Sequence, residues 1–511
     1  MSVIEGVGSL FNINFRDIDW GPDEAKGDKN LSKYFVEIPE YNDILSGRFR
    51  YVIGRKGAGK TAILERVKLE AENDPLSFAR SLSLRDFPLQ ILKSLRDKTM
   101  EDKSQYVPVW KFLILTELSK MIISDNGIED LDAVKDLKTF INNNFPGETS
   151  FIETLQVLNK NLGKINILSK FLGGEFSHEV SSQQTSSVYY QKAVVFLENK
   201  INEINSDSIY YIFVDELDEG YKAGDSGKRL LLLSLIRAIE DTYLIINRNG
   251  NIKYRPILAL RSDIFDNLLD NDLNKLDDYI IRVKWTSGNV GGYYPLKDIA
   301  TKRIRAYITE AYGQQIGDQC QGDLWGLVVD DTCQIKGAPL WNYICNNTFE
   351  RPRDIIKYMK LCQPLSGKLE SEDVKNAEYS FSSWFYNEFR DEAHSYFPIW
   401  KESLSCITKL GTGRTTTDKL ANVLKSDPQI IKWMDNNNKD VYDIIEELFN
   451  YSVVGNLDTT KRWLFKYKDD TLVFDKDKEI IVHFGFKRKL RLDIGKRDLS
   501  GVIARSPAKS N

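Results

Sequence analysis

Residues 54–61 have the sequence Gly54-Arg55-Lys56-Gly57-Ala58-Gly59-Lys60-Thr61. This stretch fits G-x-x-x-x-G-K-[ST], the pattern of a loop that binds phosphate between a strand and a helix. The β-prone run Arg50-Tyr51-Val52-Ile53 precedes it, and residues 62–69 follow with helical periodicity. Because both flanks have the required pattern, a chance match of a glycine-rich turn is the weaker interpretation. The sequence predicts a strand, a phosphate loop and a helix in that order.

The residue types in this loop suit a nucleoside triphosphate. Glycines at 57 and 59 allow the backbone to curl, so that its N–H groups form an anion nest at a helix N-terminus. Lys60 would contact the β- and γ-phosphates, and the Thr61 hydroxyl would ligate Mg²⁺. ATP and Mg²⁺ are therefore the predicted ligands. The residues expected to bind the cofactor are Gly54, Arg55, Lys56, Gly57, Ala58, Gly59, Lys60, Thr61 and Ala62.

A second apolar run ends in two carboxylates. Residues 209–214 are continuously apolar, as in a central parallel strand that is buried on both faces, and Asp215 and Glu216 follow directly. Ligands of doubly wound sheets bind at the carboxyl ends of the strands. Asp215 would hold Mg²⁺ through water, and Glu216 would orient and deprotonate the attacking water. Acidic residues follow many strands, so Asp215 and Glu216 alone are a moderate indication of a nucleotide site. Together with the phosphate-loop motif they become a strong one.

The next predicted strand, residues 254–260, ends at Arg261-Ser262-Asp263. A polar residue at this strand end would face the γ-phosphate, which makes Arg261 and Ser262 candidates for sensing it. The alternative is that Arg261 forms an ion pair with Asp263 or Asp266. A further short strand is predicted over residues 279–285.

From Pro295 onward the pattern is helical, and one helix begins with Arg351-Pro352-Arg353-Asp354. Proline is suited to the first turn of a helix, but cations at that end oppose the helix dipole. We therefore expect Arg351 and Arg353 to contact an anionic partner such as a nucleotide phosphate. Surface pairing with Asp354 or Glu350 is the alternative.

The C-terminal part predicts three helices followed by a β-hairpin. Residues 463–467 and 479–484 are strand-like and flank a polar segment, which is the plan of a winged helix. The tail beyond is rich in basic residues, which suggests contact with a phosphate backbone, although a solvated tail is the commoner explanation. These basic residues are Lys487, Arg488, Lys489, Arg491, Lys496, Arg497, Arg505 and Lys509.

Composition narrows the class of protein. The chain has 511 residues, too many for one core, and a net charge of −4, so any nucleic-acid binding must come from a local patch. The five cysteines and three histidines are dispersed, which argues against a disulfide framework or a metal cluster. The sequence shows neither a signal peptide nor an apolar run long enough for a membrane span. We expect a cytoplasmic protein with no membrane partner.

The predicted fold class is α/β, with a parallel P-loop NTPase sheet flanked by helices. We expect an N-terminal arm at 1–30 and an ATPase core at 31–294 that carries a helical insertion at about 124–188. A helical lid at 295–394, a winged-helix domain at 395–492 and a basic tail at 493–511 would follow.

The chain resembles the AAA+/STAND-type P-loop ATPases. The resemblance is carried by Gly54–Thr61, by Phe213-Val214-Asp215-Glu216 and by the order of core, lid and C-terminal winged helix, over about residues 31–490. Residues 261–265, 351–354 and 380–392 are similar to those of a group of bacterial P-loop ATPases related to the KAP-type and origin-initiator ATPases. The resemblance implies nucleotide-driven switching, oligomerisation and frequent roles in DNA transactions or anti-phage defence. Common AAA+ enzymes have Asn or Thr where this chain has Arg261-Ser262, and for the arginine finger only Arg282 and Arg303 are candidates.

Three functions fit these features. The first is a slow ATPase switch that drives oligomerisation or activates a partner protein. The second is an ATP-regulated protein that binds DNA through the winged helix and the basic tail. The third is a scaffold that holds ATP without hydrolysing it, and the presence of Lys60, Asp215 and Glu216 argues against it.

Overall fold

The computed structural model describes most of the chain and divides it into two compact units. The C-terminal unit contains Met1–Glu37, Lys56–Gly59 and Lys284–Asn511, and the sheet unit contains Ile38–Arg55 and Lys60–Val283. The described residues are 13–83, 89–96, 100–101, 104–129, 131–145, 150–161, 184–217, 226–268, 270–287, 294–330, 332–364, 367–394, 396–460 and 462–493.

The sheet unit is built on five parallel strands in the order β2-β3-β4-β1-β5. Their bounds are β1 Tyr51–Gly54, β2 Ser77–Ser83, β3 Ile209–Asp215, β4 Lys253–Arg261 and β5 Ile280–Arg282. Strands β1 and β4 are buried along most of their length, as is the apolar part of β3. This confirms the predicted α/β class, because only a sheet covered on both faces buries such apolar runs.

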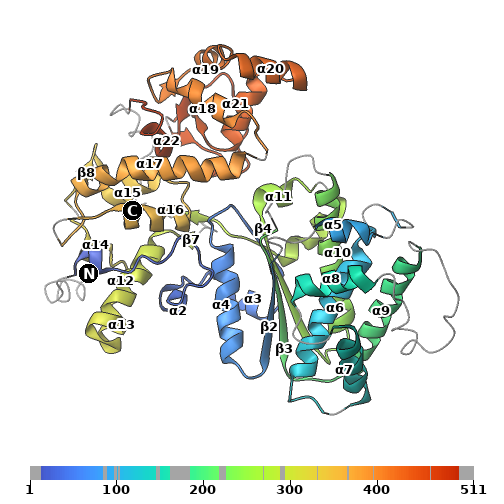
Figure 1. The fold of residues 1–511 in the computed structure, drawn as a ribbon. Coiled ribbons are helices and arrows are strands. Elements are labelled where there is room, and N and C mark those ends of the chain that lie inside the picture. Colours follow the sequence, from blue (N-terminus) through green and yellow to red (C-terminus); the bar gives the residue numbers. More distant parts are fainter. Residues whose placement is uncertain are drawn as a thin grey trace, which may run out of the picture. The chain divides into compact units, whose positions relative to one another are not determined.

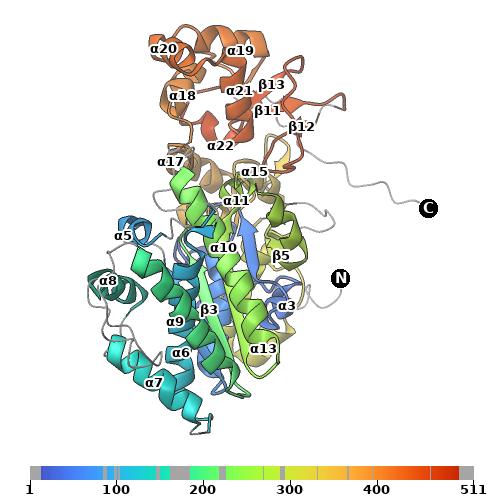
Figure 2. The same ribbon diagram turned by 90° about the vertical axis from the view of Figure 1, so that its right-hand side faces the viewer.

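Helices cover both faces of the sheet, with α4 on one face and α6, α9 and α10 on the other (Figures 1 and 2). The helices of this unit are α3 Tyr41–Leu45, α4 Lys60–Asn73, α5 Leu89–Ser94, α6 Val107–Ser124, α7 Asp132–Asn144, α8 Phe151–Asn161, α9 Gln184–Asn202, α10 Ser226–Asn247, α11 Ser262–Asp266 and the 3-10 helix η4 Asn271–Tyr279. Most of α6 is buried, as its apolar sequence predicts. Within the predicted insertion, α7 and α8 pack against α6, and residues 162–183 lie outside the described part.

The C-terminal unit is mainly helical. Its helices are η1 Phe15–Asp17, α2 Leu31–Tyr34, α12 Lys297–Tyr312, α13 Gln314–Gln319, α14 Trp325–Val328, α15 Leu340–Asn346, α16 Pro352–Leu361, α17 Ser371–Ala393, α18 Trp400–Thr408, α19 Thr417–Leu424, α20 Pro428–Asn437, α21 Val441–Asn450 and α22 Phe484–Lys487. Its strands are β6 Trp285–Thr286, β7 Tyr294–Pro295, β8 Gln334–Ile335, β9 Ala338–Pro339, β10 Arg414–Thr415, β11 Val454–Leu457, β12 Trp463–Leu464 and β13 Ile480–Val482. The helical pattern predicted from Pro295 onward is confirmed by α12 and α15–α17, and α16 begins at Pro352, within the predicted helix start.

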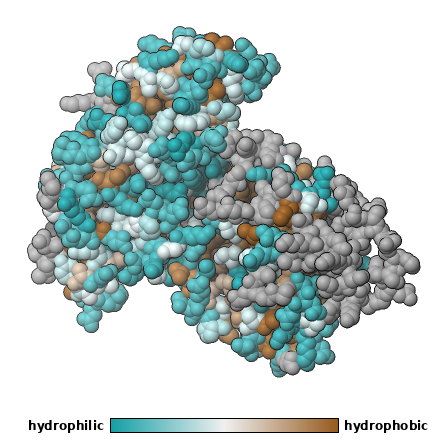
Figure 3. Space-filling view, viewed as in Figure 1, coloured by the Kyte–Doolittle hydropathy of each residue, from teal (hydrophilic) through white to brown (hydrophobic). Residues whose placement is uncertain are grey.

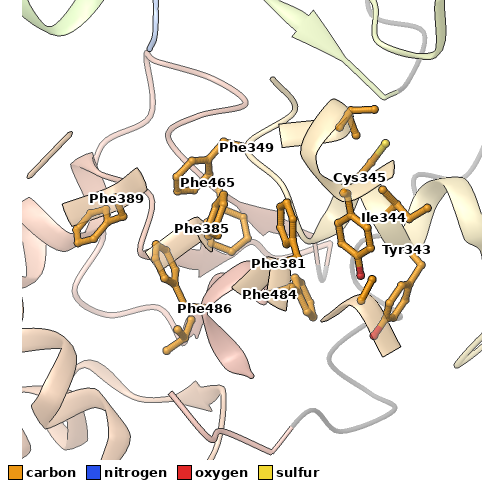
Figure 4. Packing of buried hydrophobic residues seen from close by; sticks show 14 of the residues in the cluster. Tyr343, Ile344, Cys345, Phe349, Phe381, Phe385, Phe389, Phe465, Phe484 and Phe486 are labelled. Atoms are coloured by element: carbon orange, nitrogen blue, oxygen red, sulfur yellow. The ribbon is translucent and has the colours of Figure 1, made fainter. Parts of the chain in front are cut away.

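One hydrophobic core runs through this unit from Ile13 to Leu492. Phenylalanines of α17 pack with Phe349 and with Phe484 and Phe486 of α22 (Figure 4). The N-terminal segment belongs to the same core, since Phe15 and Trp20 are buried in it. The core therefore continues across the predicted boundary at 394/395, and the division into lid and winged helix stays a prediction.

The predicted hairpin between residues 463–467 and 479–484 is wrong in its pairing. Strand β11 lies between β12 and β13 and pairs antiparallel with both, in a four-stranded sheet of order β10-β13-β11-β12. A Cβ at Gly455 of β11 would lie 2.6 Å from the Leu464 carbonyl oxygen, so only glycine allows this close approach. The prediction missed β11 because it is short and follows directly on α21.

The predicted strand 279–285 is also divided. Residues 280–282 join the main sheet as β5, whereas Trp285 begins β6, which pairs with β7 in the C-terminal unit.

On the face shown in Figure 3, hydrophilic side chains predominate among the described residues and hydrophobic ones are scattered. Among the described residues, no helix has the length and apolarity that crossing a bilayer requires.

Candidate functional site

The loop between β1 and α4 has the backbone expected of a phosphate cradle. Gly57 and Gly59 have φ angles of 80° and 97°, in the left-handed region that other residues rarely adopt. Lys60 begins the 14-residue helix α4, and its ammonium donates to the carbonyl oxygens of Gly54 (3.0 Å) and Arg55 (3.1 Å). The amine thus lies against the loop, at the end of the helix that favours anions.

The outer carbonyl groups of this loop accept hydrogen bonds within the C-terminal unit. The Arg351 guanidinium donates to the Lys56 oxygen (3.1 Å), and the Arg353 backbone N–H donates to the Gly57 oxygen (3.4 Å). The Trp285 indole N–H donates to the Ala58 oxygen (2.8 Å). Trp285 was not among the predicted site residues, because no local sequence pattern marks it.

The end of β3 brings a carboxylate to the start of α4. The Thr61 hydroxyl donates to Asp215 Oδ2 (2.9 Å), and the Glu216 backbone N–H donates to Asp215 Oδ1 (2.8 Å). Burial raises the pKa of the Asp215 carboxyl, and these hydrogen bonds only partly offset that effect. Both predicted metal ligands therefore lie together.

Glu216 has a φ of 61°, which is unusual for a residue with a side chain. Its carboxylate accepts a hydrogen bond from the Ser83 hydroxyl at the end of β2, where Ser83 pairs in register with Asp215. Strained backbone of this kind is common at functional sites. Ser83 was not among the predicted site residues, although a hydroxyl at the carboxyl end of a strand is a signal that could have found it.

Oxygen donors at this edge fit a magnesium ion. Mg²⁺ prefers hard oxygen ligands and is held by one or two protein groups together with water and substrate phosphates. Thr61 and Asp215 supply such a pair. Among the described residues, no group of three or more His, Cys, Asp or Glu side chains that could hold a metal was found. A metal ion that is also bound by a nucleotide does not require three protein side chains.

Arg261 lies at the end of β4, in register with Gly54 at the start of the loop. Its guanidinium forms a bidentate pair with Asp263, with Nε–Oδ1 and Nη2–Oδ2 distances of 3.0 and 2.7 Å. The predicted alternative of a pair with Asp263 is therefore present. Ser262 begins α11 directly after it. A sensor role for either residue stays a prediction.

Arg351 and Arg353 differ sharply in environment. The Arg351 side chain is 4% exposed and contacts Asp354, which is fully buried, and Glu392. The Arg353 side chain is 23% exposed and donates to Glu388 at 3.4 Å. Pairing of Arg351 with Asp354 was the predicted alternative, but the pair is buried rather than on the surface. The structure leaves Arg353 the more accessible of the two.

The remaining arginine candidates lie elsewhere. Arg282 is exposed and pairs with Asp266 at 2.9 Å. Arg303 is buried, donates to the carbonyl oxygens of Trp20 and Ile299, and lies over the ring of Tyr34. A finger that reaches another subunit must be exposed, so the expectation for Arg303 is wrong. Tyr34 is itself buried in the core.

Three comparisons with known proteins add limited information. Residues 294–390 match the family described as the FunZ-associated C-terminal helical domain. No curated protein matches the chain. The chain is similar to the crystal structure of Cdc6p from Pyrobaculum aerophilum, with 12% identity, a TM-score of 0.28 and coverage of 93% of each chain. Such a TM-score is too low to support any inference about this chain, and the family match is confined to α12–α17.

Proposed function

We propose that this chain binds ATP with Mg²⁺ and hydrolyses it, and that the nucleotide state controls a switch. The observation that carries the proposal is the grouping of Thr61, Asp215, Glu216 and Ser83 beside Lys60 at the carboxyl edge of a parallel sheet. Ligands of such sheets bind at this edge. Charged and hydroxyl groups at one strand edge, next to a helix N-terminus, suit phosphoryl transfer to water.

The side chains then have distinct roles. Lys60 binds the phosphate oxygens as a point charge. A bound Mg²⁺ would neutralise charge on the phosphates, with Thr61 and Asp215 as its protein ligands. Glu216 accepts the proton of the attacking water at its carboxylate. Ser83 fixes the orientation of that carboxylate through its hydroxyl group.

Nucleotide binding by the wild-type chain and by Lys60→Ala tests this proposal. Isothermal calorimetry with Mg²⁺ and ATP should detect binding by the wild type, and a phosphate-release assay should detect turnover. Lys60→Ala should lose nearly all binding, since a charge-assisted phosphate contact contributes about 1.5–3 kcal/mol and this amine contacts two phosphates. Equal affinity of the two proteins would overturn the assignment.

The switch would act on a second copy of the chain or on a partner protein. Gel filtration with and without ATP tests this part, and a shift in elution volume is the expected result. Duplex DNA in the same experiment tests the alternative of an ATP-regulated DNA-binding protein. Among the described residues that alternative has less support, because Lys487 is buried and Arg488 pairs with Glu378. The basic residues at 496, 497, 505 and 509 lie outside the described part. A defence role and a cytoplasmic location stay predictions.

A further inference from the structure

Three consecutive backbone carbonyl groups at the tip of the phosphate loop accept hydrogen bonds from residues that are distant in the chain. The donors are the Arg351 guanidinium at 3.1 Å from the Lys56 oxygen, the Arg353 backbone N–H at 3.4 Å from Gly57, and the Trp285 indole N–H at 2.8 Å from Ala58. The tip, Lys56–Gly59, groups with the C-terminal unit, whereas its neighbours along the chain group with the sheet unit.

These hydrogen bonds determine where the amide groups of the loop point. The described residues have no cis peptide bonds, and in a trans peptide the C=O and the following N–H point in opposite directions. Holding the oxygens of residues 56–58 on the outer side therefore turns the N–H groups of Gly57, Ala58 and Gly59 to the inner side. Successive N–H groups that converge in this way form an anion nest.

The donors are themselves firmly placed. Arg351 is fixed by Asp354 and Glu392, and its guanidinium lies 5.1 Å from the ring centroid of Phe349. Phe349 belongs to the aromatic cluster shown in Figure 4, where its ring lies 4.5 Å from that of Phe385. Trp285 begins β6 and packs against the same hydrophobic core.

The loop is also packed tightly on this side. A Cβ at Gly57 would lie 3.1 Å from Cβ of Arg353, so the backbone of the loop directly contacts the start of α16. Glu388 of α17 adds an ion pair with Lys56 at 3.5 Å. A loop with neighbours this close has few alternative conformations.

We propose that Trp285 and Arg351 are positioning residues that hold the phosphate loop in its binding conformation. This inference rests on the proposed function of the loop. Preorganisation of this kind raises affinity because the ordering cost is met before the ligand arrives. Both residues act on backbone carbonyl groups of the loop, so we expect their effect on ATP and ADP to be the same. The fold of the C-terminal unit thereby controls nucleotide affinity.

The test is Trp285→Phe, which keeps an aromatic ring but removes the indole N–H. The dissociation constants for ATP and for ADP, measured by calorimetry, should both rise by about threefold to tenfold, as expected for one lost hydrogen bond. The rate constant at saturating ATP should change by less than about twofold, because the lost contact is not made to the transition state.

The matched control is Trp341→Phe. Trp341 is another buried tryptophan of the C-terminal unit, and its indole N–H has no hydrogen-bond partner among the described residues. This variant should keep wild-type affinity. A melting temperature of Trp285→Phe close to that of the control would exclude general unfolding as the cause of weaker binding.

A second variant covers the case in which Trp285→Phe does not fold. Arg351→Lys keeps a cation beside Asp354 and Glu392, but a single amine cannot also reach the Lys56 oxygen as the fork does. It should weaken ATP and ADP equally. If the wild type binds ATP and Lys60→Ala does not, unchanged affinity in the folded variants refutes the positioning role alone. Absence of binding by the wild type would instead refute the proposed function.

Discussion

The end of β3 and the start of α16 each present two charged residues that sequence analysis assigned to the nucleotide. At β3, Asp215 and Glu216 accept hydrogen bonds from a threonine hydroxyl, a serine hydroxyl and one backbone N–H. Each of these three donors is a neutral group. At α16, Arg351 contacts two carboxylates, so its charge is already compensated.

The difference shows that charge and position do not suffice to make a ligand-binding residue. A charged group remains available for a ligand when its neighbours orient it without neutralising it. A buried charge needs hydrogen-bonding or oppositely charged partners within the protein. The contacts of a buried arginine therefore serve the fold before they serve a ligand. The buried pairs of Arg351 with Asp354 and Glu392 therefore favour a structural role for it, whereas the catalytic role of Glu216 and the sensor role of Arg353 stay predictions.

The largest effect is expected at Glu216. The substitution Glu216→Gln keeps the side-chain volume but removes the base, so the rate of hydrolysis should fall by about 10²–10⁴ while ATP still binds. Phosphate release under saturating ATP measures the rate, and calorimetry measures the binding. Glu72→Gln, a change of an exposed residue in α4, is the control. A rate within about threefold of wild type would show that Glu216 is not the base.

Arg351→Ala should mainly affect stability. Removal of one partner from a buried ion pair costs about 3–5 kcal/mol, because the carboxylates of Asp354 and Glu392 lose their compensation. Denaturant unfolding of the nucleotide-free protein gives the change. The triple substitution Arg351→Met, Asp354→Leu and Glu392→Met should recover part of the loss. An unchanged unfolding midpoint for the single variant would show that the buried ion pairs of Arg351 do not stabilise the fold.

Arg353→Ala sharpens the comparison on the same helix. If Arg353 senses the γ-phosphate, loss of a charge-assisted contact of about 1.5–3 kcal/mol should lower the preference for ATP over ADP by about tenfold or more. Stability should change little, since the side chain is half-buried. The control is Lys357→Ala, which removes another basic residue of α16, one that pairs with Asp23. If Arg353→Ala and Lys357→Ala have the same preference for ATP over ADP, Arg353 does not sense the γ-phosphate.

Ser83→Ala should have a smaller effect than the loss of Glu216 itself. Without the hydroxyl, the Glu216 carboxylate keeps its charge but loses one orienting contact, so hydrolysis should slow by about threefold to tenfold. Ser77→Ala at the other end of β2, where the hydroxyl donates to Asp74, should have no effect on the rate. A rate equal to wild type in both variants would remove Ser83 from the site.

The smallest effect concerns pH and Asp215. Because burial raises its pKa in the folded state, ionisation of this carboxyl opposes folding above that pKa and costs nothing below the unfolded value of about 3.9. Asp215→Asn should therefore raise the melting temperature slightly at pH 7. The gain should shrink as the pH falls through the raised pKa toward 3.9. A gain that is independent of pH would point to a cause other than ionisation.

Part of this protein follows from local sequence. The phosphate-loop motif and the apolar run before Asp215 predicted β1, α4 and β3, because a buried parallel strand and a glycine-rich turn each have a local signature. The main helices after Pro295 followed from their apolar periodicity. The same reasoning placed Thr61 near Asp215, since parallel strands end at one edge of the sheet.

Other features depend on residues that are distant in the chain. Sequence periodicity did not reveal that β11 lies between β12 and β13, because pairing of such short strands depends on their neighbours. For Arg351 and Arg261 the sequence allowed two interpretations, an ion pair within the chain or a contact with the nucleotide. The sequence cannot distinguish them, because it does not show how deeply the arginine is buried.

By itself the sequence determined the local elements: the loop, the strand that ends in carboxylates and the amphipathic helices. Tertiary structure alone decided which donors surround them. Trp285 is 227 residues from Ala58 and Arg351 is 295 residues from Lys56, yet both donate to the loop. The physical reason is that backbone conformation responds to near neighbours in the chain, whereas hydrogen-bond partners of a buried carbonyl are supplied by whichever segment the core brings beside it.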